Sequence, residues 1–196
     1  MMERNGKINR KTSETDVNLQ FTLDGSGQSS CQTGIPFLDH MLDLFATHGL
    51  FELTVEANGD LDVDFHHTTE DIGICLGLAF KEALGDAKGI YRYASGAIPM
   101  DESLCQMAID ISNRPHLSFN ADLAKGKVGD FDVELVEEFF NAFVSNARVS
   151  LHIDIVAGTN LHHMIEACFK AFGVILDRAT RHDPLKKGVP STKGIL

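Results

Sequence analysis

The sequence contains an internal repeat, and this repeat constrains the fold more than any other feature. The matching segments, each displaced by 96 or 98 residues, are His66–Glu70 with His162–Glu166, Phe37–Leu42 with Leu135–Phe140, and Phe51–Glu56 with Val149–Asp154. Self-similarity at a fixed displacement indicates duplicated structural units. We therefore expect a single domain over residues 1–196, made of two pseudo-repeats at about 1–95 and 96–190.

Both halves are expected to contain the same elements in the same order. Each half should have a helix, a strand of alternating apolar residues, and a second helix that begins near its His-His pair. The first helix spans about Pro36 to Thr47 or Glu134 to Asn146, and the strand spans Phe51–Glu56 or Val149–Val156. The sequence thus predicts an α+β protein whose two halves are each a small sheet covered on one face by helices.

Alternation of apolar and polar residues predicts three further strands. They cover Val17–Leu23, Leu61–Phe65 and Gln106–Ser112. Asp24-Gly25 follows the first of these strands, and this dipeptide is typical of a hairpin turn. We therefore expect the chain to reverse direction at that point.

Polar residues mark the expected ends of the second helix of each half. Thr68 with Asp71 resembles a capping box, and Asn160 is a good N-cap. Gly85 is expected to end the helix that follows the first His-His pair. The two helices should therefore begin close to their histidines.

Composition and charge exclude several functional classes. The chain has 28 acidic and 17 basic residues, a net charge of −11, so nucleic acid and anionic membranes are not expected partners. The longest apolar run, Ile74–Phe80, is far shorter than the roughly 20 residues that span a bilayer. The start of the chain shows no signal-peptide pattern.

The four cysteines show no paired spacing, which favours buried thiols in a cytoplasmic protein: Cys31, Cys75, Cys105 and Cys168.

The repeated His-His-x-x-Glu motif predicts a metal site. On a helix, Glu166 can approach either His162 or His163, because residues three and four apart share a face. The two adjacent histidines diverge by about 100° and so are not expected to serve one ion from the same helix. Two such motifs suit a pair of ions, and imidazole with carboxylate suits manganese, iron or zinc better than calcium.

The repeat also nominates further ligands. His40 occupies the same place in the first half as Glu138 in the second, so Glu138 is a candidate ligand if His40 is one. His152 is a rival for that role, although its repeat partner is Thr54. The remaining histidines are expected to cap helices or line a pocket: His48, His116 and His182.

Several other polar residues could hold an anionic substrate. Arg92, Arg114 and the C-terminal stretch around Ser191 and Lys193 offer cations, hydroxyls and free amides, which suit a phosphate. Glu14, Asp101 and Glu102 are carboxylates available for proton transfer. The sequence therefore combines a predicted metal site with a predicted anion site.

In these motifs the sequence resembles the imidazoleglycerol-phosphate dehydratase family. The segments that carry the resemblance follow nearly the whole chain in order and are Arg10–Thr15, Gly34–Gly49, His66–Asp71, Pro99–Glu102, Arg114-Pro115, Leu151–Ile153, His162–Phe172 and Ser191–Leu196. The resemblance implies a lyase of histidine biosynthesis that removes water from imidazole glycerol phosphate to give imidazole acetol phosphate. It also implies a duplicated fold similar to the second domain of ribosomal protein S5. The family further implies a 24-subunit homo-oligomer, with two Mn2+ ions per active site held between neighbouring subunits.

Carried over by position, the resemblance implies three groups of site residues. The metal ligands are His40, His66, His67, Glu70, His162, His163 and Glu166, with Glu138 where many relatives have histidine. The substrate-binding residues are Glu14, His40, His48, Arg92, Arg114, Ser191 and Lys193, which makes the C-terminal segment a substrate-binding tail. The carboxylates expected to act in catalysis are Glu14, Glu70 and Glu166.

The chemistry of the reaction agrees with such a site. The hydrogen to be removed is bonded to carbon and is not acidic, so a simple base cannot remove it. Metal ions on both imidazole nitrogens would stabilise the imidazolate, which can expel the adjacent hydroxyl through a diazafulvene-like intermediate. We expect Glu14 to move the proton.

Two other classes of function could use similar ligands. A dinuclear metallohydrolase of a small phosphate ester would use them with a bridging hydroxide, but it would usually show Asp-rich motifs, which this sequence lacks. A metal-storage shell would explain the acidic charge and the His-Glu clusters. It would not need Arg92, Arg114 and Lys193 around an anion.

Overall fold

The computed structural model describes residues 4–194 and contains two halves with the same order of elements. The first half consists of β1 (Asn5–Lys11), β2 (Thr15–Thr22), β3 (Ser29–Gln32), α1 (Pro36–Gly49), β4 (Glu52–Gly59) and α2 (His66–Leu84). The second consists of β5 (Tyr93–Met100), β6 (Ser103–Asp110), β7 (His116–Asn120), α3 (Leu135–Ala147), β10 (Ser150–Ala157) and α4 (Leu161–Thr180). A short hairpin of β8 (Lys127–Val128) and β9 (Phe131–Asp132) precedes α3.

The two main sheets share one topology. Their strand orders are β1-β2-β4-β3 and β5-β6-β10-β7. In both sheets the last pair is parallel, β3 with β4 and β7 with β10, and the other pairs are antiparallel. The α+β class and the internal duplication predicted from the sequence are confirmed.

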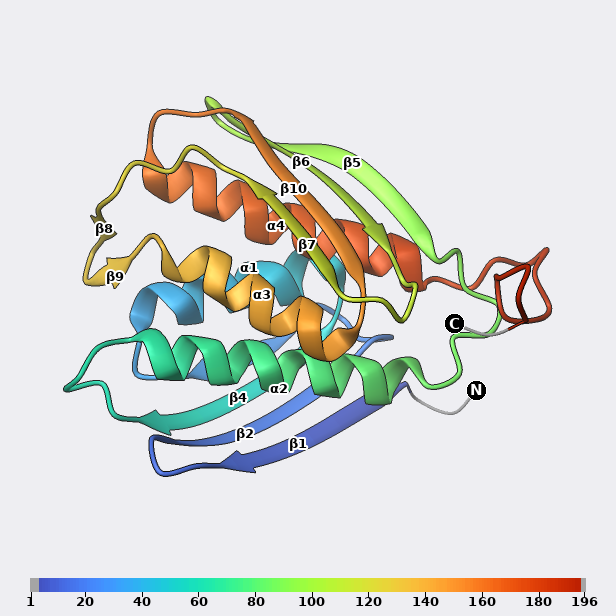
Figure 1. The fold of residues 1–196 in the computed structure, drawn as a ribbon, viewed down its shortest axis with the longest axis horizontal. Coiled ribbons are helices and arrows are strands. Elements are labelled where there is room, and N and C mark those ends of the chain that lie inside the picture. The colour runs from blue at the N-terminus through green and yellow to red at the C-terminus, as the bar shows by residue number, and fades with distance from the viewer. Residues whose placement is uncertain (1–3, 195–196) are drawn as a thin grey trace.

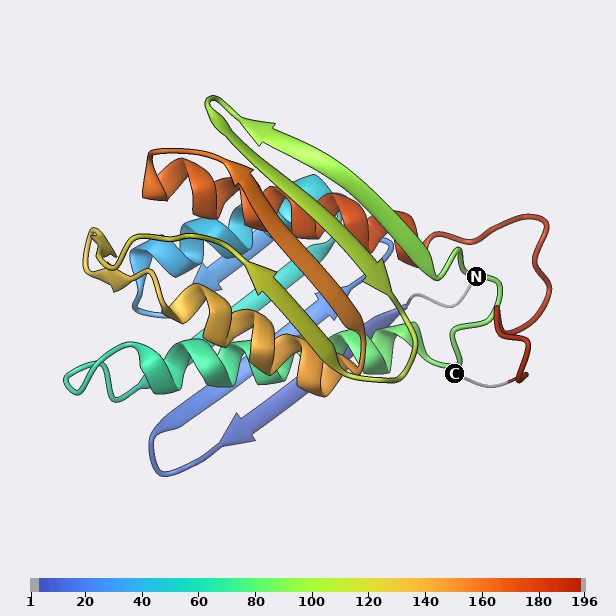
Figure 2. The ribbon, with the colours of Figure 1, turned by 45° about the horizontal axis from the view of Figure 1, so that its top comes forward.

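The four helices lie between the two sheets, and they pair across the halves (Figure 1, Figure 2). Helix α1 of the first half packs against α4 of the second, and α2 packs against α3. Aromatic rings mark both contacts, since the centroid of Phe172 lies 4.6 Å from that of Phe45 and the centroid of Phe143 lies 5.8 Å from that of Phe80. Each sheet also covers a helix of its own half, α2 in the first half and α4 in the second, so the hydrophobic core is built from both halves.

Glycines allow the paired helices to approach closely. A Cβ at Gly77 of α2 would lie 2.6 Å from the backbone oxygen of Phe143 in α3. A Cβ at Gly173 of α4 would collide with the backbone oxygen of Phe45 in α1. Gly77 and Gly173 are 96 residues apart, and Phe45 and Phe143 are 98 apart, so the duplication preserves the same contact in both helix pairs.

All four helices begin at the same end of the molecule, and the C-terminal segment lies at the opposite end (Figure 1). The predicted metal ligands are on the first turns of these helices or close to them. The fold therefore gathers them at one end. None of the helices described between residues 4 and 194 combines the length and the hydropathy needed to cross a bilayer.

The predicted strand at Leu61–Phe65 is wrong, because this segment is a turn between β4 and α2. The N–H of Val63 donates to the carbonyl of Asp60 at 2.8 Å, and the Val63 residue is 68% exposed. Strand β4 already pairs with β2 on one edge and with β3 on the other. No free edge of β4 is left for a strand at this position.

The predicted reversal of direction after Asp24-Gly25 is confirmed, because β3 is parallel to β4 and β4 is antiparallel to β2, but the predicted hairpin is wrong. Strand β2 pairs with β1 and β4, so the chain cannot return along it. It continues instead to β3, which pairs in parallel with β4.

Two of the three predictions about helix ends are confirmed, and one is wrong. Asn160 caps α4, because its side chain accepts the N–H of His162 at 2.9 Å, and Gly85 ends α2. The capping box of Thr68 with Asp71 is wrong. Asp64 accepts the N–H of His66 at 2.7 Å, and Asp71 binds Arg10.

We predict that Gly173→Ala lowers the stability of the folded protein. The added methyl group meets backbone atoms of α1, which cannot move aside as a side chain can, and overpacking of this kind costs about 1–3 kcal/mol. Thermal and denaturant unfolding measure the change, with Ser145→Ala on the exposed face of α3 as the control. A Gly173→Ala protein as stable as the wild type would show that the α1–α4 contact tolerates a wider spacing.

Candidate metal centre and anion site

His40, His162 and Glu166 form a cluster at the contact between α1 and α4. The Nε2 atoms of His40 and His162 lie 3.6 Å and 3.3 Å from Glu166 Oε2. Within residues 4–194 these three residues are the one group of at least three His, Cys, Asp or Glu residues whose ligand atoms all lie within 4.8 Å of one another. His40 comes from one half and the other two from the second half, so the cluster depends on the pairing of helices across the halves.

Glu166 is buried, and Lys170 holds it in its ionised form. The Lys170 ammonium lies 2.6 Å from Glu166 Oε1, one turn further along α4. Burial alone would raise the pKa of Glu166, but the hydrogen bond and charge of Lys170, with His40 and His162, keep this pKa below its ordinary value. Glu166 therefore presents Oε2 as an anionic oxygen beside two imidazole nitrogens.

The two histidines of each motif point in different directions, as predicted. The rings of His162 and His163 are inclined by 81°, and those of His66 and His67 by 88°. His162 faces Glu166, whereas His163 faces away from it toward Glu102. Each pair can thus offer its two rings to different ions.

A carboxylate holds the Nδ1 atom of the second histidine in each motif. His163 Nδ1 lies 2.7 Å from Glu102 Oε2, and His67 Nδ1 lies 2.9 Å from Asp60 Oδ2. These hydrogen bonds raise the pKa of both histidines, and the His163 contact holds the pKa of Glu102 well below its ordinary value. In both rings Nε2 remains on the side away from the carboxylate.

The first-half counterpart of the cluster is less compact. His66, Glu70 and Glu138 correspond to His162, Glu166 and His40, but their ligand atoms do not come within 4.8 Å of one another in the described chain. All three residues are half-buried at the same end of the molecule. Glu14, in the turn between β1 and β2, places Oε1 3.9 Å from His67 Nε2.

The donor set fits a transition-metal ion. Two imidazole nitrogens and a carboxylate oxygen are ligands that manganese, iron and zinc accept. Three donors from one cluster leave coordination positions open for other ligands. The cluster can therefore hold an ion and still bind a further molecule through it.

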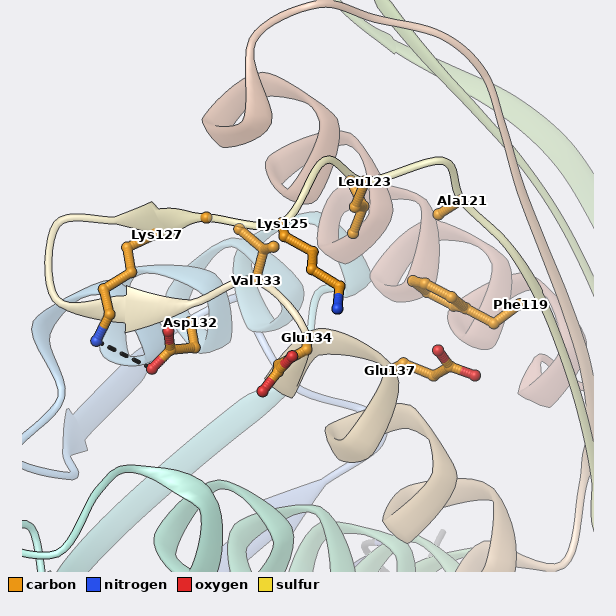
Figure 3. A pocket seen from close by; sticks show the side chains of 10 residues that line it. Phe119, Ala121, Leu123, Lys125, Lys127, Asp132, Val133, Glu134 and Glu137 are labelled. Carbon is orange, nitrogen blue, oxygen red and sulfur yellow. Dashed lines mark ion pairs between the residues drawn. The ribbon is translucent and has the colours of Figure 1, made fainter.

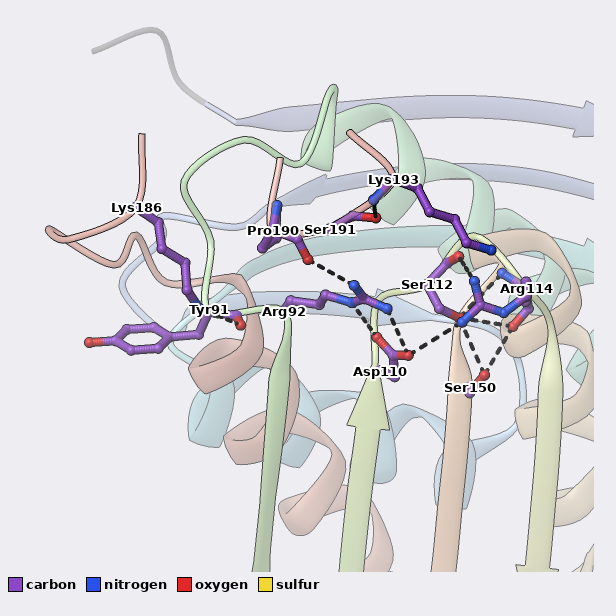
Figure 4. A network of polar contacts seen from close by, with 10 residues as sticks. All are labelled: Tyr91, Arg92, Asp110, Ser112, Arg114, Ser150, Lys186, Pro190, Ser191 and Lys193. Atoms are coloured by element: carbon purple, nitrogen blue, oxygen red, sulfur yellow. Dashed lines mark hydrogen bonds and ion pairs between the residues drawn. The ribbon is translucent and has the colours of Figure 1, made fainter. Parts of the chain in front are cut away.

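The predicted anion-binding residues form a separate network (Figure 4). The buried Arg92 guanidinium donates to both carboxylate oxygens of Asp110, at 2.7 and 3.1 Å, and to the carbonyl of Pro190 at 2.7 Å. Arg114 is exposed, with Nη2 3.7 Å from the same Asp110 carboxylate. Ser191 and Lys193 lie beside the two arginines, where the Lys193 N–H donates to Ser191 Oγ at 3.2 Å.

The network and the metal cluster lie at opposite ends of the molecule. The N–H of Arg92 donates to the carbonyl of Ala179 in the last turn of α4, whereas His162 is in its first turn. Ala179 follows His162 by 17 positions, which corresponds to about 25 Å at the rise of an α-helix. Within one subunit, the arginine network and the metal cluster therefore do not form a single site.

Two other histidines lie away from the cluster. His48 is in the last turn of α1, eight residues or about 12 Å from His40 along the helix. His152 is exposed on β10, between the buried Leu151 and Ile153, so it points to the sheet face opposite the helices. Its ring lies 5.5 Å from that of His116.

Four residues with a direct place in these networks were given no such role from the sequence. Asp60, Glu102, Asp110 and Lys170 each contact a predicted ligand or anion-binding residue. Lys170 could have been noticed, because it follows Glu166 by four residues on one helix face. Asp60 and Glu102 lie in loops and Asp110 lies at the end of β6, so no sequence spacing identifies the residues that they contact.

Two hollows open on the side of the molecule where α1 and α3 begin. One has a volume of about 460 Å³ and is lined by His40 together with Phe37, Phe65 and Phe131. The other, of about 420 Å³, lies between β7 and the start of α3 and is lined by Phe119, Leu123, Lys125, Glu134 and Glu137 (Figure 3). Only the first includes one of the clustered ligands, so it is the one next to the candidate metal centre.

Comparison with known proteins gives a consistent result. The family model described as imidazoleglycerol-phosphate dehydratase matches residues 33–176. Proteins of that name from Trichlorobacter lovleyi and Bacillus subtilis are 59% and 60% identical, over 100% of both chains for the first and over 95% of this chain and 96% of the relative for the second.

Solved structures of the same name have the same fold. The enzyme from Staphylococcus aureus superposes with a TM-score of 0.83 at 47% identity, covering 91% of this chain and 99% of the other. The one from Pyrococcus furiosus superposes with a TM-score of 0.84 at 34% identity, covering 96% and 100%. The family model and the full-length relatives agree with each other and with the predicted resemblance. The chain belongs to the imidazoleglycerol-phosphate dehydratase family.

Proposed function

We propose that this protein is a hydro-lyase that converts imidazole glycerol phosphate into imidazole acetol phosphate in histidine biosynthesis. The observation that carries the proposal is the cluster of His40, His162 and Glu166, found in a chain whose full-length relatives are named for this reaction. In this proposal, residues 1–196 form one dehydratase domain of two pseudo-repeats, about 1–95 and 96–190, with a C-terminal substrate-binding tail. The cytoplasmic location expected from the scattered cysteines is part of the same proposal.

The proposed cofactor is a pair of Mn2+ ions per active site. The residues that would hold them are His40, His66, His67, Glu70, Glu138, His162, His163 and Glu166. When bound, the ions would act as Lewis acids that stabilise the deprotonated imidazole of the substrate. Glu166 suits a ligand better than an acid, because Lys170 keeps its carboxylate ionised.

Glu14 is the proposed acid/base. Its side chain is 50% exposed and its Oε1 lies 3.9 Å from His67 Nε2, so a substrate at the metal end would meet it. A carboxylate there can accept the proton from the substrate carbon and deliver a proton to the departing hydroxyl. His48, Arg92, Arg114, Ser191 and Lys193 are the proposed substrate and phosphate contacts, with His40 next to the imidazole.

The separation of the two ends supports active sites shared between subunits. A distance of about 25 Å along α4 is much longer than a three-carbon phosphate attached to an imidazole ring. One subunit would then supply the cluster of His40, His162 and Glu166, and another would supply the arginines and the C-terminal tail. We propose that the 24-subunit homo-oligomer implied by the resemblance provides this arrangement.

The phosphate-ester hydrolase remains the alternative, and no specific observation favours it. The relatives with the same full-length match carry the dehydratase name. An assay for release of phosphate from a simple ester distinguishes the two activities directly.

The proposal predicts that turnover depends on Mn2+. Protein stripped with a chelator should lose turnover of imidazole glycerol phosphate, and added Mn2+ should restore it, because the substrate imidazole is not acidic without the ions. The ketone product is followed by its ultraviolet absorbance in alkali. Full turnover after complete stripping would refute the cofactor, and hydrolysis of a phosphate ester without dehydration would favour the alternative.

Glu14→Gln is expected to lower kcat at least about 100-fold, which is the usual scale of acid/base assistance. Mn2+ content and KM should change little, because the amide has the size of the carboxylate and Glu14 is exposed. Steady-state kinetics and metal analysis of the same preparation check both quantities. An unchanged kcat would exclude Glu14 as the proton carrier.

Shared sites predict rescue between two inactive variants. His162→Asn removes a ligand at the metal end of the folded subunit, and Lys193→Ala removes a cation at the opposite end. Subunits mixed one to one before assembly should recover activity in about a quarter of the sites, where the intact ends of different chains meet. Mixtures as inactive as the parent variants would show that both ends of a site come from one chain.

A further inference from the structure

We propose that Glu102 and Asp60 are positioning residues that hold Nδ1 of His163 and His67 and so direct Nε2 of each ring toward metal. This inference rests on the proposed ligand role of these two histidines. It goes further by assigning a task to two carboxylates that are not themselves among the proposed ligands. The argument begins with the geometry around Glu102.

Glu102 is fixed at both of its oxygens. Oε2 accepts the Nδ1–H of His163 at 2.7 Å, while Oε1 accepts the backbone N–H groups of Asn160 and Thr159 at 2.9 and 3.2 Å. The backbone donors belong to the segment that leads into α4. The carboxylate is therefore tied to the start of the helix that carries His163, and its two oxygens cannot exchange places freely.

A carboxylate that only accepts hydrogen bonds determines which ring nitrogen carries the hydrogen. Oε1 of Glu102 already accepts two backbone N–H groups, so the carboxylate acts as an acceptor and the ring nitrogen that faces Oε2 must donate. In the neutral ring the other nitrogen, Nε2, then carries the lone pair that a metal needs. Carboxylates in this position also orient the ring and raise its basicity as a ligand.

Asp60 makes the same contact in the first half, but with less support. Its Oδ2 accepts from His67 Nδ1 at 2.9 Å. Its Oδ1 is buried without a hydrogen-bond partner among residues 4–194. Only one of its two oxygens is therefore committed.

The two carboxylates come from different places in the repeat. Glu102 is in the turn between β5 and β6, and the corresponding turn between β1 and β2 contains Glu14. Asp60 follows Gly59 at the end of β4, as Thr159 follows Gly158 after β10. A Cβ at either glycine would meet the third or fourth residue of the next helix, Thr68 or Met164.

This exchange accounts for the different place of Glu14, whose Oε1 lies 3.9 Å from Nε2 of His67 and not at Nδ1. In the second half, the turn carboxylate holds the histidine, and Thr159 supports it with its N–H. In the first half, Asp60 stands at the position of Thr159 and holds His67 itself. Glu14 is thereby left on the Nε2 side of His67, where we have placed the proton carrier.

The sharpest test is Glu102→Gln. The backbone N–H groups of Asn160 and Thr159 would keep the amide oxygen on their side, so the amide NH2 would face His163 Nδ1. A donor there moves the ring hydrogen to Nε2 and blocks the ligand atom. We expect the Mn2+ affinity to fall about 10- to 100-fold, the range known for such partners of ligating histidines.

Asp60→Asn should have a smaller effect. Because Oδ1 has no partner in the described chain, the amide can turn and present its oxygen to His67 Nδ1. The hydrogen then stays on Nδ1, and Nε2 keeps the lone pair that a metal needs, although the turned NH2 group is buried without an acceptor. A loss of Mn2+ affinity as large as that of Glu102→Gln would contradict the role assigned to the two oxygens.

The measurement is competition between a chelator and the Mn2+-loaded protein, together with the melting temperature of the stripped protein. Glu82→Gln is the matched control, because Glu82 also accepts a backbone N–H, from Lys7 at 2.9 Å, on an exposed part of α2. Its Mn2+ affinity should equal that of the wild type. Nitrogen-15 spectra of labelled histidines in stripped protein should show the hydrogen of His163 on Nδ1 in the wild type and on Nε2 in Glu102→Gln.

The outcomes separate this inference from the proposed function. Wild-type protein that binds no Mn2+ would refute the proposed cofactor and the inference with it. Wild-type protein that binds Mn2+ with the same affinity as Glu102→Gln would refute the inference alone. A weaker affinity together with a clearly lower melting temperature of the stripped variant would mean that Glu102 only anchors the turn, which also refutes it.

Discussion

The pairing of helices across the two halves is the contact on which the rest of the structure depends. Helix α1 can rest on α4 because Gly173 has no side chain where the backbone of Phe45 passes, and Gly77 gives α2 the same access to α3. His40 reaches Glu166 only through this packing. Stability and the metal cluster therefore rest on the same helix interface, and a shift of α1 would disturb both.

Much of the architecture could be predicted from the sequence because the repeat and the buried faces are local signals. The helices with strong apolar patterns and the central strands β2, β4, β6 and β10 were expected close to their observed positions. The edge strands β1 and β5 were not, since β1 is largely polar and both are defined by their neighbours. The turn at Leu61–Phe65 alternates like a strand, but the occupied edges of β4 exclude it from the sheet.

The candidate site divides in a similar way. The ligand types could be predicted because His-His-x-x-Glu is duplicated, and the repeat placed His40 opposite Glu138. The supporting residues Asp60 and Glu102 could not be assigned, because both lie in loops whose positions relative to the histidines are set only by the fold. The distance between the metal cluster and Arg92 could not be predicted from the sequence either. It arises because Arg92 contacts the last turn of α4 while His162 lies in the first turn.

The placement of complementary functions at opposite ends has a consequence for assembly. On the proposed sharing, the end of one copy must meet the other end of the next, which is a heterologous contact. Such contacts continue as an open filament unless the rotation between copies brings the last one back to the first. A closed shell is the arrangement in which every copy both gives and receives a half-site. Every active site would then be complete only in a closed assembly. An open filament of subunits would always have an incomplete site at each of its two ends.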